Sequence, residues 1–579
     1  MFNTTASRQK KYAPYPVVDL QDRKWPANVI TKAPLWCSVD LRDGNQALPI
    51  PMSIEEKLEL FSLLVELGLK EIDAGYPAAS ETEYAFIRRL ITEDLIPEDV
   101  TIQVICPCIS DLIGRTFDAV RGARQVIIHF MNSTSPLQRS VVFNADKEMV
   151  AGMAAKAARL IRTKGEALAA GGTKVIYEYS PESFTETELD YALEICEQVM
   201  DTIGADEENP MIINLPATVE KTTPNVYADR IEWFCRNTRQ RNRFILSVHT
   251  HNDRGSAVAA TELALLAGAD RVEGTLFGNG ERTGNADLVT LALNLHTQGI
   301  DPGLDFSNIN RVRDIYQKTT RMKVAARHPY AGEYVYTAFS GTHQDAILKA
   351  LSYRQKNRQI SWQVPYLPID PADVGRQYEP IIRINSQSGK GGAAFIMESL
   401  YGYQVPKAML PELGHLVKAV ADKTGGEITG DTLVSLFKEE FIQVESPYYL
   451  KSFQTYYLNE EDEEDNEVCF TGTILHHGEP VEVEGRGNGP IDALYNALRS
   501  LGAADYAFLS YDQHAMSAGS DSRAIAYIQL KDKNGNTRFG VGTSKDIKKA
   551  SLRALICAVN RMSRIEEYPL SPFFSSSPA

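Results

Sequence analysis

A short apolar, β-prone run followed by a stretch with helical spacing recurs eight times between about residues 34 and 285. Between these runs, apolar side chains return every three or four residues, as in helices that bury one face. Eight consecutive strand–helix units predict an α/β fold, a (β/α)8 TIM barrel. A doubly wound open sheet is the alternative, but eight consecutive strand–helix units are less typical of such a sheet than of a closed barrel. The apolar runs cover residues 35–41, 71–74, 101–106, 125–130, 174–179, 211–215, 244–248 and 271–277.

The helix expected after residue 53 is indicated by neighbouring residues alone. Ser53 is placed as its N-cap, and Glu56 three residues later completes a capping box. An apolar stripe follows at Leu58, Phe61, Leu64 and Val65. We therefore expect this helix to pack one face against the barrel.

Polar residues follow every one of the eight runs, in segments such as DLRDGNQ, EYSPES, HTHND and FGNGERTGN. In a (β/α)8 barrel the active site lies at the carboxyl ends of the strands. Ordinary turns need Gly, Asn or Asp, but they do not need this much Arg, Glu and His at one end. The pattern therefore indicates an enzyme.

The pattern changes after about residue 320, where turn-rich helical segments replace the strand–helix repeat. An acidic run at 459–467 reads as a solvated loop. Alternating strands, a hairpin turn at Asn534-Gly535 and a final amphipathic helix follow it. The predicted parts are an extension (1–31), a catalytic barrel (32–320), two linker subdomains (321–385 and 386–445), an α+β regulatory domain (446–568) and a disordered tail (569–579).

Composition narrows the class of protein. The formal charge is −15 and no long Lys/Arg block occurs, so no nucleic-acid partner is expected. No apolar run is long enough for a membrane span and no secretory signal is visible, so we expect a cytoplasmic protein. The seven cysteines are irregularly spaced, which argues against a disulfide framework.

His249 and His251 stand two positions apart at the end of the seventh run. Residues i and i+2 of a strand point to the same side, so the two imidazoles can share one ligand. Two imidazoles at a strand end are typical of a metal site.

Closure of the barrel would bring the first and eighth strands to the seventh, and with them Asp43 and Asn285. Two imidazoles and a carboxylate leave coordination positions open for a substrate. The ligand set suits Zn²⁺, Mn²⁺ or Mg²⁺ and does not decide between them. A plainer interpretation is that Asp43 caps a turn and pairs with Arg42.

Two charged residues beside this set are candidate catalytic groups. Arg42 can stabilise a developing oxyanion or enolate. Glu182, after the fifth run, can act as acid, base or hydrogen-bond partner, although it can equally open a helix with Ser183 and Thr185. The glycine loops at 277–285 and 388–392 match neither a Walker nor a dinucleotide motif, but they leave room for a phosphate-bearing ligand.

Longer motifs then resemble a known family. The chain closely resembles 2-isopropylmalate synthases of the longer type over about residues 32–565, with long motifs in the same order. The resemblance implies that acetyl-CoA condenses with 2-oxoisovalerate in the committed step of leucine biosynthesis. The motifs include LRDGNQ, GYPAASETE, NLPATVEKTTPNVYADRIEW, HTHNDRG, GTLFGNGERTGN, RHPYAGEYVYTAFSGTHQDA, QVPYLPIDPADVGR and GRGNGPIDAL.

The resemblance also implies roles for single residues. A divalent metal (Mg²⁺, Mn²⁺ or Zn²⁺) is held by Asp43, His249 and His251 with Asn285 in or near the shell, and K⁺ is a possible activator. Arg42 and Glu182 are catalytic-site residues. The positions that match the substrate pocket are His129, Ser180, Asn214 and Thr218.

The family further implies a homodimer with active sites shared between subunits. His343 and Tyr366 match linker residues that reach over the neighbouring subunit's barrel and complete its catalytic group. A C-terminal domain binds leucine as feedback inhibitor. The positions carried over to that leucine site are Asn488, Gly489, Pro490, Ala518 and Asp521.

One departure and several rivals remain. Met131 stands where relatives commonly have an aromatic residue, which leaves the keto-acid preference open. Citramalate synthase (pyruvate) and homocitrate synthase (2-oxoglutarate) share the chemistry. A metal-dependent hydrolase on a TIM barrel and a non-catalytic amino-acid sensor are more remote alternatives.

Overall fold

The computed structural model describes residues 14–338, 340–378, 393–394, 397–398, 401–424, 428, 430–458, 467–517 and 522–567. The chain forms two compact units. The first comprises residues 1–336 with 369–378, and the second residues 337–368 with 379–579.

The first unit is a closed barrel of eight parallel strands in sequence order. Pairing of β1 with β8, in which Cys37 lies opposite Glu273, closes the ring and excludes the open sheet. The TIM barrel predicted from periodicity is therefore confirmed. The strands are β1 (Leu35–Ser38), β2 (Glu71–Gly75), β3 (Thr101–Pro107), β4 (Gln125–Ser133), β5 (Lys174–Glu182), β6 (Met211–Ala217), β7 (Phe244–Thr250) and β8 (Arg271–Gly274).

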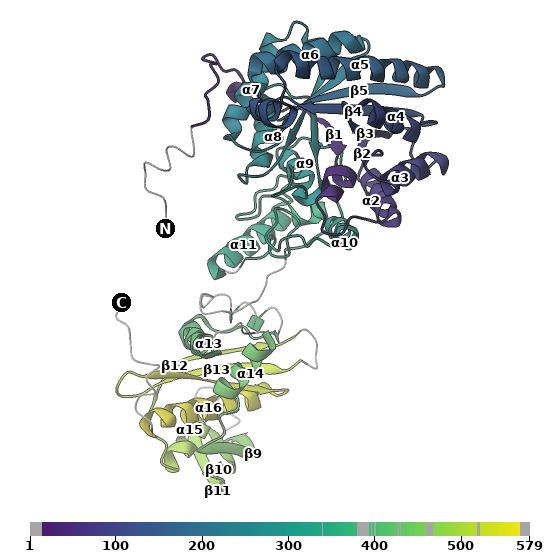
Figure 1. Cartoon of the computed structure of the whole chain (residues 1–579). Helices are drawn as coiled ribbons and strands as arrows, with labels where there is room; N and C mark the ends of the chain where they lie inside the picture. Colours follow the sequence, from purple (N-terminus) through teal and green to yellow (C-terminus); the bar gives the residue numbers. More distant parts are fainter. Residues whose placement is uncertain are drawn as a thin grey trace. The chain divides into compact units, whose positions relative to one another are not determined.

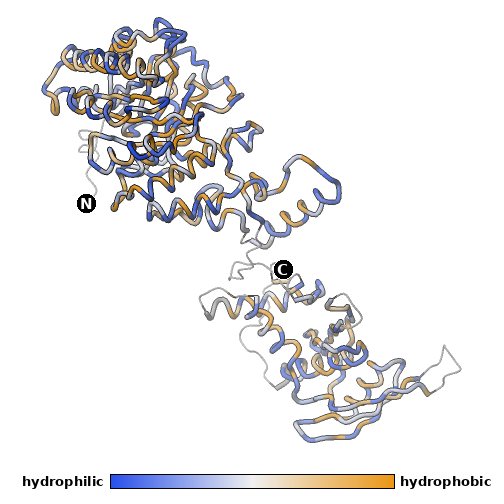
Figure 2. Tube along the Cα trace, turned by 90° about the vertical axis from the view of Figure 1, so that its right-hand side faces the viewer, coloured by the Kyte–Doolittle hydropathy of each residue, from blue (hydrophilic) through white to orange (hydrophobic). Residues whose placement is uncertain are grey.

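Helices cover the outside of the ring, as Figure 1 shows for α2 to α8. Along these helices apolar and polar residues alternate in short blocks (Figure 2), the pattern of elements that bury one face. The helices are α2 (Ile54–Glu66), α3 (Glu81–Thr92), α4 (Ser110–Ala119), α5 (Lys147–Ala170), α6 (Leu189–Ile203), α7 (Pro224–Asn237), α8 (Ala257–Leu266), α9 (Leu288–Thr297) and α10 (Ile309–Thr320). The capping box expected at Ser53 and Glu56 is present in α2.

Some strands are shorter and others longer than the apolar runs in the sequence. β1 and β8 are shorter than the apolar runs predict, because the chain leaves β1 at Ser38 and forms a single π-helical turn over Asp40–Gly44. β4 and β5 are longer, and they carry Met131 and Glu182 as strand residues. Glu182 therefore ends a strand, and the Phe184–Glu186 segment after it makes only one 3-10 turn.

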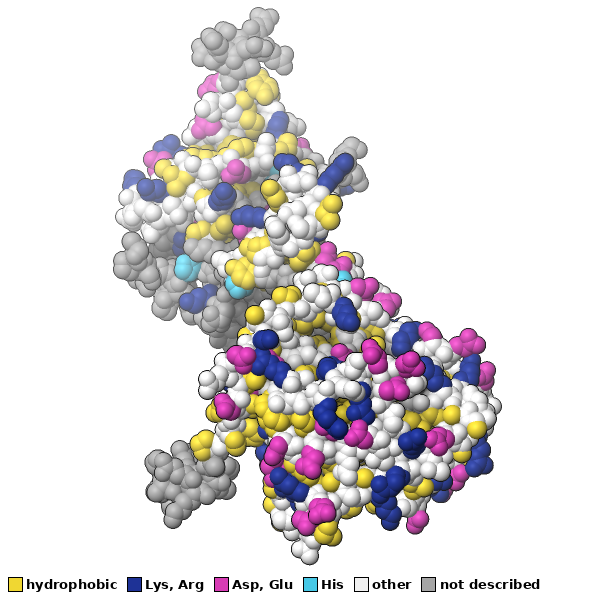
Figure 3. Space-filling view, turned by 90° about the horizontal axis from the view of Figure 1, so that it is seen from above, with side chains coloured by type: hydrophobic (Ala, Val, Ile, Leu, Met, Phe, Trp, Pro, Cys, Tyr) yellow, Lys and Arg dark blue, Asp and Glu magenta, His cyan; other side chains and the backbone are white. Residues whose placement is uncertain are grey.

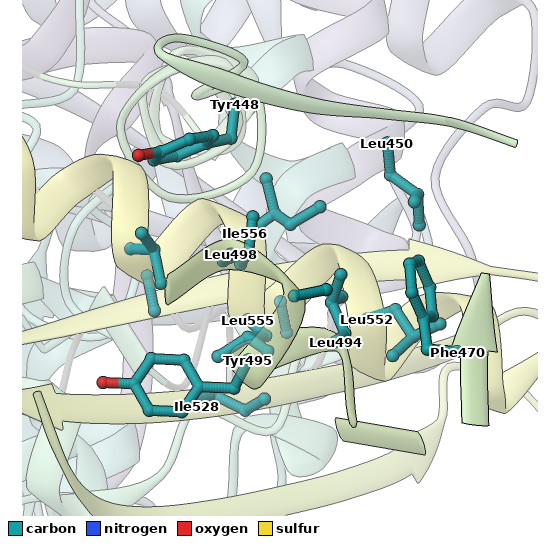
Figure 4. Packing of buried hydrophobic residues seen from close by; sticks show 14 of the residues in the cluster. Tyr448, Leu450, Phe470, Leu494, Tyr495, Leu498, Ile528, Leu552, Leu555 and Ile556 are labelled. Atoms are coloured by element: carbon teal, nitrogen blue, oxygen red, sulfur yellow. The ribbon is translucent and has the colours of Figure 1, made fainter. Parts of the chain in front are cut away.

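The C-terminal part of the second unit contains two three-stranded antiparallel sheets, in the orders β11-β10-β9 and β12-β13-β14. The predicted hairpin at Asn534-Gly535 joins β13 and β14. Helices α15 and α16 and both sheets share one apolar core, part of which Figure 4 shows around Leu494, Leu498, Ile528 and Leu555. The elements are β9 (Tyr448–Tyr457), β10 (Val468–His476), β11 (Glu479–Gly487), α15 (Pro490–Ser500), β12 (Ala507–Ala515), β13 (Ala524–Lys531), β14 (Thr537–Ser544) and α16 (Ile547–Glu567).

Before these sheets, the described residues include the helices α11 (Gly341–Asn357), α13 (Leu410–Thr424) and α14 (Gly430–Phe441). A second apolar cluster joins α13 and α14 to β13 and β14 through residues such as Leu413, Phe437 and Phe539. None of the helices in the described part of the chain is long and apolar enough to cross a membrane. On the face of the barrel unit turned to the viewer in Figure 3, acidic and basic side chains are interspersed.

Candidate active site at the carboxyl ends of the strands

The barrel mouth contains a cavity of about 450 Å³ formed by the carboxyl ends of the strands and the loops that follow them. Nine residues singled out from the sequence line it together, although they come from five different strands or strand ends. They are Arg42, Asp43, His129, Ser180, Glu182, Asn214, Thr218, His249 and His251.

The two histidines meet as the strand period predicts. The Nε2 atoms of His249 and His251 lie 3.3 Å apart, and the Asp43 Oδ2 atom lies 3.4 Å from the first and 3.7 Å from the second. All three side chains are buried. Closure of the barrel supplies Asp43, since it follows β1 and β1 pairs with β8.

Asn285 lies against the same group through an isolated bridge to His251. Its Nδ2 donates a 2.7 Å hydrogen bond to Asp43 Oδ2. Its buried Oδ1, like the buried Nδ1 of His251, has no hydrogen-bond partner among the described residues. Buried polar atoms normally have partners, so the Asn285 Oδ1 atom beside His251 is suited to face a bound ligand.

The side chains fit a divalent metal. One ligand atom from each of Asp43, His249 and His251 lies within 4.8 Å of the others. The Glu273 Oε2 atom lies 2.9 Å from His249 Nδ1, so this nitrogen keeps its proton, and a bound metal would displace the proton from His249 Nε2 to use its lone pair. Two imidazole nitrogens and a carboxylate oxygen that converge in this way are the donor set of a metal site.

The charged side chains of this group shift one another's pKa values. Burial alone would raise the pKa of Asp43, but Arg42 and the hydrogen bond with His249 hold it well below its usual range. Burial opposes charge on His249, yet its bonds to Asp43 and Glu273 raise its pKa to about 9. Burial and the neighbouring His249 lower the pKa of His251 to about 4. The negative side chains thus favour a cation at this position.

Arg42 is clamped between two carboxylates. Its Nε donates to Asp73 Oδ2 at 2.8 Å, and its Nη1 lies 3.4 Å from Asp43 Oδ1. The pairing of Asp43 with Arg42 that the plainer interpretation assumed is present, but it occurs together with the contacts to the histidines. The guanidinium is held rigidly beside the ligand set and lines the cavity.

Asp73, Gln103 and Glu273 belong to the site and were missed in the sequence. Each is a polar residue inside a buried strand, at 0–1 % exposure. A charged residue at an inward position of an apolar run, as in EIDAG or RVEG, is the signal that was available.

The opposite wall carries the residues matched to the substrate pocket. Ser180 Oγ lies 2.7 Å from His129 Nε2 and 3.0 Å from Asn214 Nδ2. Glu182 accepts a hydrogen bond from Ser133. Thr218 Oγ1 accepts from the backbone N–H of Ser183 at 2.9 Å, which ties the loop after β5 to that after β6.

The glycine loop at 277–285 has a structural explanation. Gly280 has φ +157°, and a Cβ there would approach the Asn285 amide to 2.9 Å. Gly284, with φ +95°, lies directly against the carbonyl of Gly278. The glycines let the loop fold tightly over Asn285. The second glycine loop, 388–392, lies outside the described residues.

The structure does not bring His343 and Tyr366 into this cavity. Their rings stack on each other with centroids 3.9 Å apart and planes at 21°. Both belong to the second unit, and neither is among the described residues that line the cavity. Tyr366 is 60 % exposed, so its ring has a free face.

Three of the five positions matched to a leucine site are described. Gly489 is the N-cap of α15, Pro490 is its first residue, and the backbone N–H of Asn488 donates to Asp492 Oδ2 at 3.0 Å. This is a tight strand-to-helix turn with small side chains. Ala518 and Asp521 lie outside the described residues.

Comparison with known proteins covers nearly the whole chain. Three family models match in sequence: HMGL-like (33–315), alpha-isopropylmalate synthase post-catalytic domain-like (333–398) and LeuA allosteric (dimerisation) domain (427–563). A 2-isopropylmalate synthase from Clostridium acetobutylicum is 52 % identical over 551 residues, 95 % of this chain and 99 % of the relative. One from Rhodospirillum rubrum is 52 % identical over 554 residues, 96 % and 99 % of the two chains. Among solved structures, hydroxymethylglutaryl-CoA lyase from Pseudomonas aeruginosa aligns at 17 % identity and TM-score 0.42, over 51 % of this chain and 96 % of the lyase.

Proposed function

Because the chain belongs to the 2-isopropylmalate synthase family, we propose that it joins acetyl-CoA to 2-oxoisovalerate and releases 2-isopropylmalate and CoA. It is an acyltransferase of leucine biosynthesis, and its allosteric domain serves feedback inhibition by leucine. The observation that carries this proposal is the full-length similarity to such synthases at about half identity. The predicted domain boundaries remain predictions.

Asp43, His249 and His251 would hold the divalent metal, with Asn285 beside them. When bound, the metal supplies Lewis-acid chemistry to the oxygens of the keto acid. The donor set leaves Mg²⁺, Mn²⁺ and Zn²⁺ as candidates, and K⁺ is proposed as an activator.

The chain's own residues account for charge and position. In the reaction the acetyl methyl group loses a proton and its carbon bonds to the keto carbon, whose oxygen gains a proton and becomes a hydroxyl. Water then cleaves the thioester, and CoA leaves. Arg42, held by Asp73, is the fixed cation that stabilises negative charge on oxygen during the carbon–carbon step. Glu182 is the carboxylate of the opposite wall that is available for proton transfer.

Substrate contacts are assigned to the opposite wall. His129, Ser180, Asn214 and Thr218 are proposed to bind the keto acid through its oxygens. His343 and Tyr366 are proposed to reach this cavity from a second copy in a homodimer, consistent with the dimerisation domain. The stacking of the two rings and the exposure of Tyr366 support this proposal.

Apolar lining favours a branched alkyl group over smaller or charged ones. Ile105, Pro107 and Met131 contribute to the wall of the cavity. The rim cation Arg282 is already paired with Asp253 at 2.7 Å, so it is not free for the second carboxylate of 2-oxoglutarate. The two methyl groups of 2-oxoisovalerate add buried apolar area that pyruvate lacks.

A panel of keto acids tests the substrate. With CoA release as readout, kcat/KM for 2-oxoisovalerate is expected to exceed that for pyruvate or 2-oxoglutarate at least about tenfold, since each buried methylene contributes on the order of tenfold. Leucine is expected to lower the rate with the preferred substrate. A preference for pyruvate would assign the chain to citramalate synthesis instead. CoA release that needs no keto acid would indicate a hydrolase.

A further inference from the structure

Gln103, on β3, lies fully buried at the centre of the barrel, between the metal-ligand side and the keto-acid side of the cavity. Its Oε1 is 2.7 Å from Arg271 Nη2. Its Nε2 is 2.9 Å from Glu273 Oε1, 3.2 Å from His129 Nδ1 and 3.3 Å from Asp73 Oδ2. Gln103 is not among the residues with an assigned role in the proposed reaction.

The orientation of this amide is determined by its neighbours. Arg271 offers only donors, so the atom facing it at 2.7 Å must be the amide oxygen. Arg271 Nη1 also donates to Glu273 Oε1 at 3.0 Å, so this oxygen is an acceptor and the Gln103 atom facing it must be the amide nitrogen. The reverse orientation would place donor against donor and oxygen against oxygen.

This orientation decides which nitrogen of His129 carries the proton. The Gln103 NH₂ group has two hydrogens, one for Glu273 Oε1 at 2.9 Å and one for His129 Nδ1 at 3.2 Å, whereas Asp73 Oδ2 at 3.3 Å already accepts from Arg42 Nε. A hydrogen on His129 Nδ1 would point at this NH₂ group, so Nδ1 is the acceptor. Burial lowers the pKa of His129 to about 3, so the ring carries one proton, on Nε2. The Glu178 carboxyl lies 3.7 Å from Nδ1, and burial raises its pKa well above the usual range, so it requires no proton from His129.

The proton on His129 Nε2 also determines the direction of the hydrogen bonds at Ser180. His129 Nε2–H donates to Ser180 Oγ at 2.7 Å. Asn214 Nδ2 donates to the same oxygen at 3.0 Å, and its orientation is set by Glu273 Oε2 at 3.3 Å. Two donors occupy the lone pairs of Ser180 Oγ, so neither neighbour can accept its hydrogen. That hydrogen points into the cavity that Ser180 lines.

We propose that Gln103 is a positioning residue that, through the tautomer of His129, makes the Ser180 hydroxyl a one-directional hydrogen-bond donor to an oxygen of the bound keto acid. The proposal rests on the proposed function for the identity of that ligand. The hydrogen-bond direction itself follows from the contacts of Gln103, His129 and Ser180 alone. Gln103 touches no substrate, and its effect is transmitted by two intervening hydrogen bonds.

The tautomer is directly measurable. In protein labelled with ¹⁵N-histidine, His129 is expected to show a protonated Nε2 and an unprotonated Nδ1. A protonated Nδ1 in the unaltered protein would overturn the proposal, and this reading needs no variant. In Gln103→Met, of similar size, a share of Nδ1–H tautomer is expected. Thr101→Val serves as the control, because it replaces another buried polar residue, two positions earlier on the same strand. It should leave the signals unchanged.

Kinetics test the consequence for the substrate. Gln103→Met is expected to raise KM for the keto acid about tenfold, the ratio that one hydrogen bond supplies, with KM for acetyl-CoA changed less than about twofold. Ser180→Ala should give a similar loss, and the double variant little more than either single change. Fully additive losses, or an unchanged keto-acid KM in Gln103→Met, would refute the proposal. If no keto acid supports CoA release by the unaltered protein, the proposed function fails, whereas the tautomer remains a separate result.

Discussion

The His251→Ala enzyme is expected to bind divalent metal at the barrel mouth only weakly and to lose at least about 1,000-fold in kcat/KM, because a metal contributes several kcal/mol of transition-state stabilisation. His251 is buried, and its Nε2 is one of three ligand atoms that converge there. Removing it leaves one imidazole and one carboxylate, a pair that retains metal weakly. Titration of metal-free protein with Mn²⁺ or Zn²⁺ measures the binding, and CoA release measures turnover.

His296→Ala is the matched control for this change. His296 lies on α9 with its side chain 42 % exposed, and it pairs with Asp373. Its loss should leave both metal binding and turnover unaltered, because an exposed pair of this kind contributes little. Full activity of His251→Ala in metal-free buffer would show that the assignment of the ligands is wrong.

Arg42→Lys is expected to reduce kcat about 100- to 1,000-fold, the range measured when one preorganised oxyanion donor is lost, while metal binding is retained. Lysine keeps the positive charge beside Asp43. It cannot reproduce the fork in which Nε bonds Asp73 at 2.8 Å while Nη1 faces Asp43 at 3.4 Å. The variant therefore separates charge placement from metal loss, which His251→Ala does not.

Arg241→Lys provides the comparison for Arg42. Arg241 lies just before β7, at the opposite end of the barrel, where its guanidinium pairs with Asp270. The same substitution there should change kcat less than about twofold, since an exposed ion pair contributes roughly 0–1 kcal/mol. An Arg42→Lys enzyme with unreduced kcat and normal metal content would remove Arg42 from the catalytic group.

The barrel and the cluster of Asp43, His249 and His251 were predictable because they follow from the periodicity of single strands and from the order of strands in a closed ring. Apolar runs located all eight strands, and period two on β7 placed His249 and His251 on one side. Asp43 then followed from closure of the ring, which requires β1 to lie beside β8. These inferences need only the direction of side chains on a strand and the order of strands in a barrel.

The polar network inside the barrel was not predictable, because its contacts join residues that are far apart in the sequence. Asp73, Gln103 and Glu273 come from three different strands and meet only through the register of the closed barrel. A single polar residue in an apolar run does not reveal its partner. The same limit applies to His343 and Tyr366, whose proposed role depends on a second copy. The placement of Glu182 depended on where β5 ends, and that strand end lies three residues beyond the apolar run.

Transfer of the acetyl carbon to the keto acid is the central claim, and the fate of that carbon tests it most directly. Metal-loaded protein would be given acetyl-CoA labelled with ¹³C in the methyl group, together with 2-oxoisovalerate. The account predicts that the label appears in the new methylene of 2-isopropylmalate, one product for each CoA released, and that omitting the keto acid stops CoA release. Label recovered as free acetate, with CoA released at the same rate in the absence of keto acid, would contradict it.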